Sequence, residues 1–132
     1  MMKRTAFIVI ACLCVAAPFY AQATEPECNF SSYKPLVLNH ALLNAATKNV
    51  QPKYPSVAKA AHAAGKVQVK ILVDRFGNVV EACVSQGHPL LRAAARDAAL
   101  EWKFKKNFGF SKKSKLNARY IQSFLFFNFR LE

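Results

Sequence analysis

Acidic residues and glycine are scarce in this sequence. Its 132 residues include 7 Asp and Glu against 19 Lys and Arg, so the formal net charge is +12. Glycine occurs 4 times and proline 6 times, which excludes collagen-like and low-complexity chains. Hydrophobic residues make up 53% of the chain, too many for a disordered basic tail. The length suits one domain, whose apolar content beside strong positive charge predicts contact with a membrane or an anionic surface.

Motifs of known catalytic sites are also missing. The sequence has no phosphate-binding loop, no dinucleotide fingerprint and no spaced carboxylate pair. Ser85, His88 and Asp97 are the residue types of a hydrolytic triad, but no Gly-x-Ser-x-Gly turn presents the serine. The cysteines and histidines are not spaced as metal ligands. We therefore predict a non-enzymatic protein without catalytic residues, metal or cofactor.

One stretch is long and apolar, and it lies at the start. Lys3 and Arg4 precede an uncharged run over residues 5–17, and Ala21-Gln22-Ala23 has the pattern of a cleavage site. The run of about 13 residues is shorter than the roughly 20 that cross a bilayer as a helix. We expect residues 1–23 to be a cleaved signal peptide. An uncleaved inner-membrane anchor and lipidation at Cys12 are the alternatives.

Cysteine use agrees with export. Cys12 and Cys14 lie in the expected signal peptide, so Cys28 and Cys83 are the pair that remains. An oxidising compartment makes a disulfide between them the default prediction. Closing a loop of that length contributes about 4 kcal/mol in the chain-entropy treatment. Free thiols and an intermolecular bridge are the alternatives.

The rest of the chain divides into an N-terminal extension, residues 24–50, and a domain, residues 51–132. In the extension, Leu36–Ala46 predicts a weak helix with its apolar residues on one stripe. In the domain, a second short helix is expected from Pro55 to the glycine at position 65. The two expected stripes are Leu38, Leu42 and Ala45 in the first helix and Val57, Ala58, Ala61 and Ala64 in the second.

Residues 66–84 predict a β-hairpin, because apolar and polar residues alternate on both sides of a turn at residues 75–78. Cys83 falls on the opposite face of this hairpin, where the N-terminal segment could lie across it. The side chains expected on the buried face are Val67, Val69, Ile71, Val73, Val80, Ala82 and Val84.

Residues 89–102 predict a helix, and residues 119–131 predict a last strand. This strand is apolar on both sides over residues 124–127, so it has two faces to cover, or one to cover and one to present. The order helix–strand–strand–helix–strand predicts an α+β fold, a small three-stranded antiparallel sheet packed by two helices. The inward stripe of the long helix is Leu91, Ala94, Ala95, Ala98 and Trp102.

The stretch 51–131 resembles the C-terminal domain of TonB, the energy transducer of Gram-negative outer-membrane transport. Each matching piece is short, but their shared order and spacing are specific. The pieces are Gln51-Pro52-x-Tyr54-Pro55, Gly65-x-Val67-x-Val69, Val73-Asp74-x-x-Gly77-x-Val79 and Leu91-x-x-Ala94-Ala95-x-x-Ala98-x-x-x-Trp102-x-Phe104.

The resemblance implies a periplasmic binding module. TonB C-terminal domains bind the TonB box, a short segment of outer-membrane receptors, by strand addition along the edge of their last strand. The expected partner is an outer-membrane TonB-dependent receptor in energy-coupled transport, and a homodimer through the last strand is an alternative. The partner-binding positions implied here are Gln51, Arg119, Tyr120, Ile121, Gln122, Ser123, Phe124, Leu125, Phe126 and Phe127.

Two other functions remain open at this point. A cationic envelope protein would bind anionic surfaces through the basic loop 103–115, whereas no nucleic acid is expected for an exported chain. An uncleaved residue 1–23 segment would instead give a short membrane-anchored transducer. The loop carries Lys103, Lys105, Lys106, Lys112, Lys113 and Lys115, interleaved with Phe104, Phe108 and Phe110.

Overall fold

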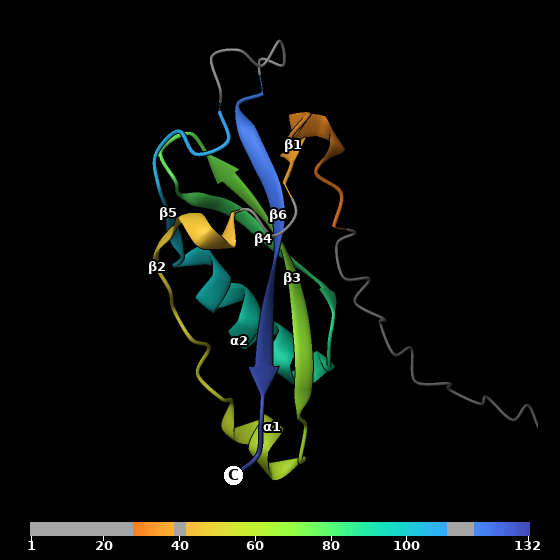
Figure 1. The fold of residues 1–132 in the computed structure, drawn as a ribbon. Coiled ribbons are helices and arrows are strands. Elements are labelled where there is room, and N and C mark those ends of the chain that lie inside the picture. Colours follow the sequence, from red (N-terminus) through yellow and green to blue (C-terminus); the bar gives the residue numbers. More distant parts are fainter. Residues whose placement is uncertain (1–27, 39–41, 111–117) are drawn as a thin grey trace, which may run out of the picture.

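The structure is a computed structural model that describes residues 28–38, 42–110 and 118–132. In chain order its elements are the 3-10 helix η1 (Ser31–Tyr33), β1 (Leu36–Val37), the 3-10 helix η2 (Leu43–Ala45), β2 (Ala46–Lys48), α1 (Ser56–Ala60), β3 (Gly65–Asp74), β4 (Val79–Gln86), α2 (Pro89–Leu100), β5 (Lys103–Phe104) and β6 (Tyr120–Phe129). The centre is an antiparallel sheet in the order β6-β3-β4, and α2 packs against it (Figure 1). The predicted α+β fold is confirmed.

The alternating residues of β3 give the sheet a buried, hydrophobic inner face. Its alternating residues Val67, Val69, Ile71 and Val73 are all buried against α2 and the rest of the core, as the alternation predicts. Leu72 points to the opposite face and is buried as well. The outer face of the sheet is therefore covered too, at least around Leu72.

β4 differs from the prediction at one position. Val80 is 41% exposed, and Val79 takes the buried place opposite Val73. The cause is an irregular register, in which Leu72 pairs with Glu81 while Val73 pairs with Val79, so one extra residue bulges out of the strand. Beyond the bulge the predicted alternation returns, and Ala82 and Val84 pack against the core.

α2 begins where the sequence predicts and ends two residues earlier. The His88 side chain caps it, since its Nδ1 accepts a hydrogen bond from the Leu90 N–H at 3.2 Å. Trp102 follows the helix, yet its ring is still buried and lies 6.1 Å from the Phe127 ring. The small residues on the inner stripe let α2 lie close to the sheet, with Leu91 as its fully buried large side chain.

α1 is shorter than the predicted helix. It ends at Ala60, because His62 adopts a left-handed backbone conformation with φ of 52°. Of the predicted stripe only Ala58 is buried, whereas Val57 is 64% exposed. The chain reverses here, and Ala63 rather than Ala61 or Ala64 enters the core.

The hairpin turn at residues 75–78 is confirmed and fastened from two sides. Asp74 Oδ1 accepts hydrogen bonds from the N–H groups of Phe76 and Asn78, each at 2.9 Å. Gly77 has φ of +83°, and a Cβ there would lie 2.0 Å from the Phe104 carbonyl oxygen. The turn thus needs glycine both for its conformation and for the close approach of β5.

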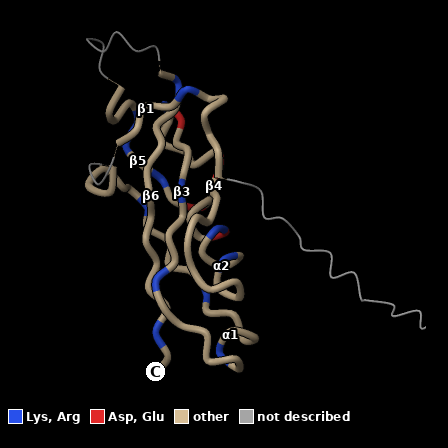
Figure 2. Tube along the Cα trace, turned by 90° about the vertical axis from the view of Figure 1, so that its right-hand side faces the viewer, with Lys and Arg blue, Asp and Glu red and all other residues tan. Residues whose placement is uncertain are grey.

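The outer face of the sheet is crossed by residues 28–38, which we call the outer cover (Figure 2). The predicted disulfide between Cys28 and Cys83 is present, with 5.5 Å between the Cα atoms, and fixes the cover to β4. At the other end β1 pairs in parallel with β6 and makes a fourth strand. The predicted helix Leu36–Ala46 is wrong in its described part, because the chain there forms β1, η2 and β2; residues 39–41 lie outside the described residues.

Within the described part of the chain, no helix has the length and apolar character to cross a membrane. The expected signal peptide, residues 1–23, lies outside the described residues.

Candidate partner-binding edge

β6 has different neighbours on its two sides. On one side it pairs with β3 over the whole strand, from Tyr120 opposite Asp74 to Phe129 opposite Gly65. On the other side β1 covers just the beginning, where Leu36 pairs with Ile121. The expected edge, which begins at Arg119, is therefore occupied in its first residues by the chain itself.

The remaining length of β6 has backbone groups that face away from β3. The Leu38 N–H donates to the Gln122 carbonyl at 3.0 Å, so Gln122 turns its backbone groups toward β1. Since successive residues of a strand alternate in this respect, Phe124, Phe126 and Asn128 also turn theirs away from β3. Among the described residues no strand pairs with these three on that side, and we call them the open edge.

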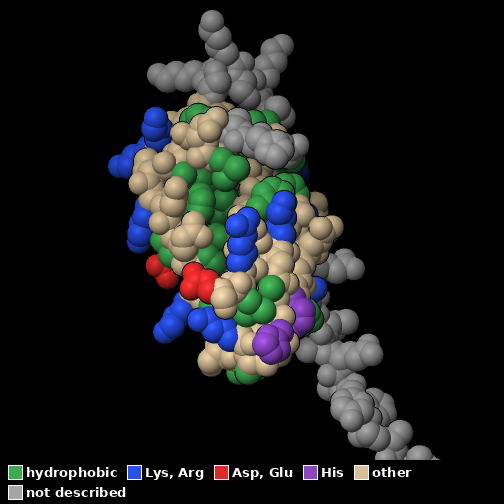
Figure 3. Space-filling view, turned by 60° about the horizontal axis from the view of Figure 1, so that its bottom comes forward, with side chains coloured by type: hydrophobic (Ala, Val, Ile, Leu, Met, Phe, Trp, Pro, Cys, Tyr) green, Lys and Arg blue, Asp and Glu red, His purple; other side chains and the backbone are tan. Residues whose placement is uncertain are grey.

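The side chains of the open edge lie on the outer face of the sheet. Phe126 is 46% exposed, and the Lys66 ammonium nitrogen lies 5.5 Å from the centre of its ring. Lys70 stands opposite Phe124, and Lys66 stands opposite Asn128. Figure 3, with the α1 end brought forward, shows one face of the molecule, on which hydrophobic side chains line a hollowed strip with Lys and Arg on both sides and Asp and Glu at its lower end. An added strand would meet backbone groups, aromatic surface and positive charge.

Four of the predicted contact residues have buried side chains. Ile121, Ser123, Leu125 and Phe127 point into the core and are at most 3% exposed. They alternate with the outward-facing residues, and their backbone groups face β3. In this structure a partner on the open edge cannot reach these side chains. The Ser123 hydroxyl has no hydrogen-bond partner among the described residues.

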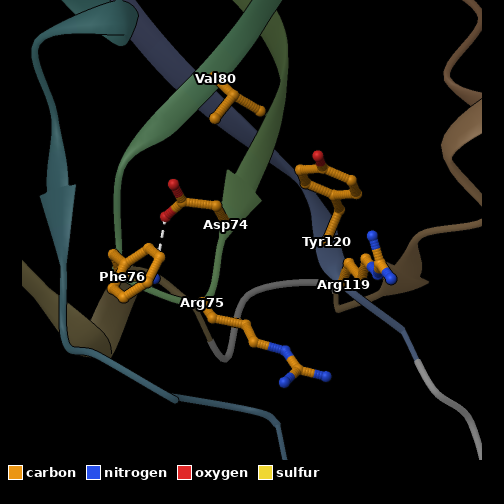
Figure 4. A pocket seen from close by; sticks show the side chains of 6 residues that line it. All are labelled: Asp74, Arg75, Phe76, Val80, Arg119 and Tyr120. Carbon is orange, nitrogen blue, oxygen red and sulfur yellow. Dashed lines mark hydrogen bonds between the residues drawn. The ribbon is translucent and has the colours of Figure 1, made fainter.

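Arg119 and Tyr120 lie at a hollow instead of the open edge. This hollow of about 580 Å³ separates the hairpin tip, with Phe76 and Val80, from the start of β6 (Figure 4). The ring of Tyr120 packs edge-on against Tyr33, with 5.3 Å between ring centres. The Tyr33 hydroxyl donates to Glu81 at 2.6 Å, and this hydrogen bond, followed by the negative charge of Glu81, raises the pKa of Tyr33 above 10.0.

Gln51 lies on the α2 side of the molecule. It is exposed and lines a second hollow of about 570 Å³ between residues 50–56 and the last turns of α2. Trp102 links this segment to β6, because its Nε1–H donates to the Val50 carbonyl at 2.8 Å while its ring packs on Phe127. The structure thus places Gln51 next to Val50, the residue that Trp102 joins to Phe127 near the end of β6.

The basic loop is described in part. Phe104 is buried, and Phe108 and Phe110 pack half-buried against the core, so all three rings contribute to packing within the domain. The Lys103 ammonium donates to the Asn78 side chain at 2.8 Å. Lys112, Lys113 and Lys115 lie outside the described residues.

No group of three His, Cys, Asp or Glu side chains suited to a metal ion occurs in residues 28–38, 42–110 and 118–132.

A family profile, described as Gram-negative bacterial TonB protein C-terminal, matches residues 50–126. The chain belongs to this family. The TonB C-terminal domain is a protein-interaction module and not an enzyme family, and in TonB it binds outer-membrane transporters.

A solved structure gives a further likeness to the TonB C-terminal domain. It is the solution NMR structure of the Pseudomonas aeruginosa TonB CTD, with 22% sequence identity and a TM-score of 0.49. The match covers 66% of this chain and 85% of that one. Comparison with curated proteins gives no match.

β1 is the element of the partner-binding edge that the sequence pattern does not predict. Its signal is the short apolar run at residues 36–38, which lies far from β6 in the chain and has no turn joining it to that strand. Pairing of this kind has no local pattern, and the run was interpreted as part of a helix.

Proposed function

We propose that this protein is a periplasmic binding module that engages an extended segment of an outer-membrane transporter by adding it as a strand to β6. The observation that supports this is the open edge, three outward-facing residues without a strand partner among the described residues. Unpaired N–H and C=O groups supply affinity to an incoming strand, and alternate side chains supply selectivity. The open edge is shorter than expected, because β1 takes the Gln122 position.

Gln51 would contribute from the α2 side. Because Trp102 bonds to Val50 and packs on Phe127, a partner lying along β6 has Gln51 on a segment anchored to the same ring. The expected export by residues 1–23 agrees with a site in the periplasm and is part of the proposal.

A second copy of the chain is the competing occupant of the edge. Pairing β6 with β6 would bring together two strands that each have Lys66 of β3 beside them and Arg130 at their end, in a chain whose full sequence has a net charge of +12. Repulsion between like charges opposes that dimer and does not oppose a partner with acidic residues.

The decisive experiment removes a single backbone donor from the open edge. Phe126→Pro and Phe126→Ala both lose the ring, but only proline also loses the N–H that faces the partner. A TonB-box peptide should bind the proline variant about fivefold more weakly than the alanine variant, the value of one net hydrogen bond. NMR titration of the purified protein would give both affinities and the positions of the shifts.

In the wild-type protein we expect the shifts to centre on residues 124–128 and near Gln51. Binding that leaves the β6 amides unperturbed would contradict strand addition. Dimerisation of the free protein that the peptide fails to reverse would assign the edge to a second copy instead.

A further inference from the structure

Besides its disulfide, the outer cover contacts the sheet at Phe30, at Tyr33, which bonds to Glu81 and packs on Tyr120, and at β1. Phe30 is its one large buried side chain, at 5% exposed, and lies against Lys70. The Lys70 ammonium donates to the Cys28 carbonyl at 2.7 Å. The contacts of Lys70 lie at the β4 end of the cover, close to Cys83.

The β1 end of the outer cover is short and partly exposed, although Leu36 and Leu38 pack half-buried against the core. β1 has two residues, of which Leu36 is half-buried and Val37 is 54% exposed. Tyr33, just before it, is 37% exposed. A ladder of this length is not stable unless something keeps it in place.

We propose that the outer cover competes with the partner for the first part of the β6 edge, at Gln122, and is kept in place by the Cys28–Cys83 disulfide. β1 occupies the position on β6 that a longer partner strand would take. The Leu38 N–H donates to the Gln122 carbonyl, as an N–H group of such a strand would. The disulfide on one side and the chain that continues to the buried Leu42 on the other give β1 an effective concentration of roughly millimolar at this edge, so two paired residues are enough. This inference rests on the proposed function of β6.

The consequence for binding is a division of the edge into two parts. Phe124, Phe126 and Asn128 accept a partner directly, whereas Gln122 becomes available after β1 has left. The apparent affinity for a long segment is reduced by the fraction of molecules in which β1 is bound. A short segment that pairs with the open edge alone escapes this competition.

The first test opens the tether. The double variant Cys28→Ser/Cys83→Ser keeps β1 and its chain connection to the domain, but removes the cross-link that fixes the outer cover to β4. The probe is a synthetic peptide of residues 34–40, Lys-Pro-Leu-Val-Leu-Asn-His, which copies β1 with its flanks. We expect this peptide to shift the Gln122 amide of the double variant in NMR spectra and to leave the wild-type spectrum unchanged. Protection of core amides such as Val69 from hydrogen exchange verifies that the variant is folded.

The second test leaves the disulfide intact, in case the double variant does not fold. Leu38→Pro removes the N–H that donates to Gln122, and Leu38→Ala is the control that loses the same side chain but keeps the donor. A TonB-box peptide long enough to reach Gln122 should bind the proline variant about fivefold more tightly than the alanine variant.

The outcomes separate this inference from the proposed function. Equal affinities of the two Leu38 variants, together with unchanged hydrogen exchange at the residue 38 amide in the double cysteine variant, would overturn the competitor role. If no variant binds the TonB-box peptide, the proposed function fails. In that case, binding of the 34–40 peptide to the opened edge still decides whether β1 occupies it only by virtue of the tether.

Discussion

The two faces of the central sheet are covered in different ways. The inner face meets α2, which buries Leu91, Ala95 and Ala98 against the valines of β3. The outer face meets the extended outer cover, in which Phe30 is buried and Tyr33 packs between Phe30 and Tyr120. The Cys28–Cys83 disulfide joins this segment to β4. The α2 cover is part of the hydrophobic core, whereas the outer cover reaches that core with the half-buried Leu36 and Leu38. The proposed competitor role requires that β1 can leave β6 while the fold remains.

The comparison also separates stability from function. Every large side chain on the inner face is needed to fill the core, so a substitution there acts on the whole domain. The outer face borders the partner-binding edge, and a substitution there changes which backbone groups of β6 are free. The following experiments test this division, from the largest expected effect to the smallest.

Truncation of α2 at its buried leucine should have the largest effect. Leu91→Ala removes a fully buried side chain from the inner face, and the expected loss in the free energy of unfolding is about 2–5 kcal/mol. Leu90→Ala is the control, since that leucine is 39% exposed and its loss should change stability by less than about 0.5 kcal/mol. Urea denaturation followed by circular dichroism measures both, and similar losses would contradict the burial of Leu91.

Truncation of the outer cover should have a smaller and more local effect. Phe30→Ala should lower the free energy of unfolding by less than the roughly 3–5 kcal/mol usual for a core phenylalanine, because the cover can detach. Hydrogen exchange at the residue 38 amide should become faster, while exchange at Val69 stays slow. If both amides exchange faster together, the two covers form one cooperative unit and the comparison fails.

The buried hydroxyl of Ser123 gives a prediction of opposite sign. Its oxygen has no partner among the described residues, so Ser123→Ala removes an unsatisfied polar group and creates little empty space. We expect the free energy of unfolding to stay the same or to rise by at most about 1 kcal/mol, which a thermal melt would detect as an unchanged or higher melting temperature. A loss of more than that amount would mean that the hydroxyl has a bonding partner.

The Tyr33–Glu81 hydrogen bond should give the smallest effect, and it depends on pH. The pKa of Tyr33 is raised in the folded protein, so the contribution of the bond is complete below the unfolded pKa near 10 and is lost as the pH rises through the folded pKa. Tyr33→Phe should therefore be slightly less stable than wild type at pH 7, and the difference should vanish at higher pH. A difference that does not change with pH would exclude the bond as its cause.

The inner face could be predicted from the sequence because its signals are local. The alternation over Val67–Val73 and the stripe that begins at Leu91 each lie within one element. Val80 was predicted on the wrong side, because a bulge changes the alternation and leaves no mark in the residue types. Val57 was predicted in the core because the periodicity does not show that the helix ends at Ala60.

The outer face is harder to predict from the sequence, and so is the extent of the candidate site that borders it. Which strand lies at the edge depends on contacts between distant residues, and β1 meets β6 across most of the chain. The pairing of Cys28 with Cys83 followed from their number, since two cysteines allow one intramolecular bridge. The path of the outer cover over the sheet depends on contacts of Tyr33 and Lys70, which no sequence pattern predicts.

Among the described strands β6 is the last to be synthesised, yet it lies between β1 and β3. At roughly 5–20 residues per second, β3 waits several seconds on the ribosome before its main neighbour exists. During that time the valine row of β3 has nothing to pair with on one side. The hydrophobic core therefore cannot be completed until the residues of β6 have been synthesised.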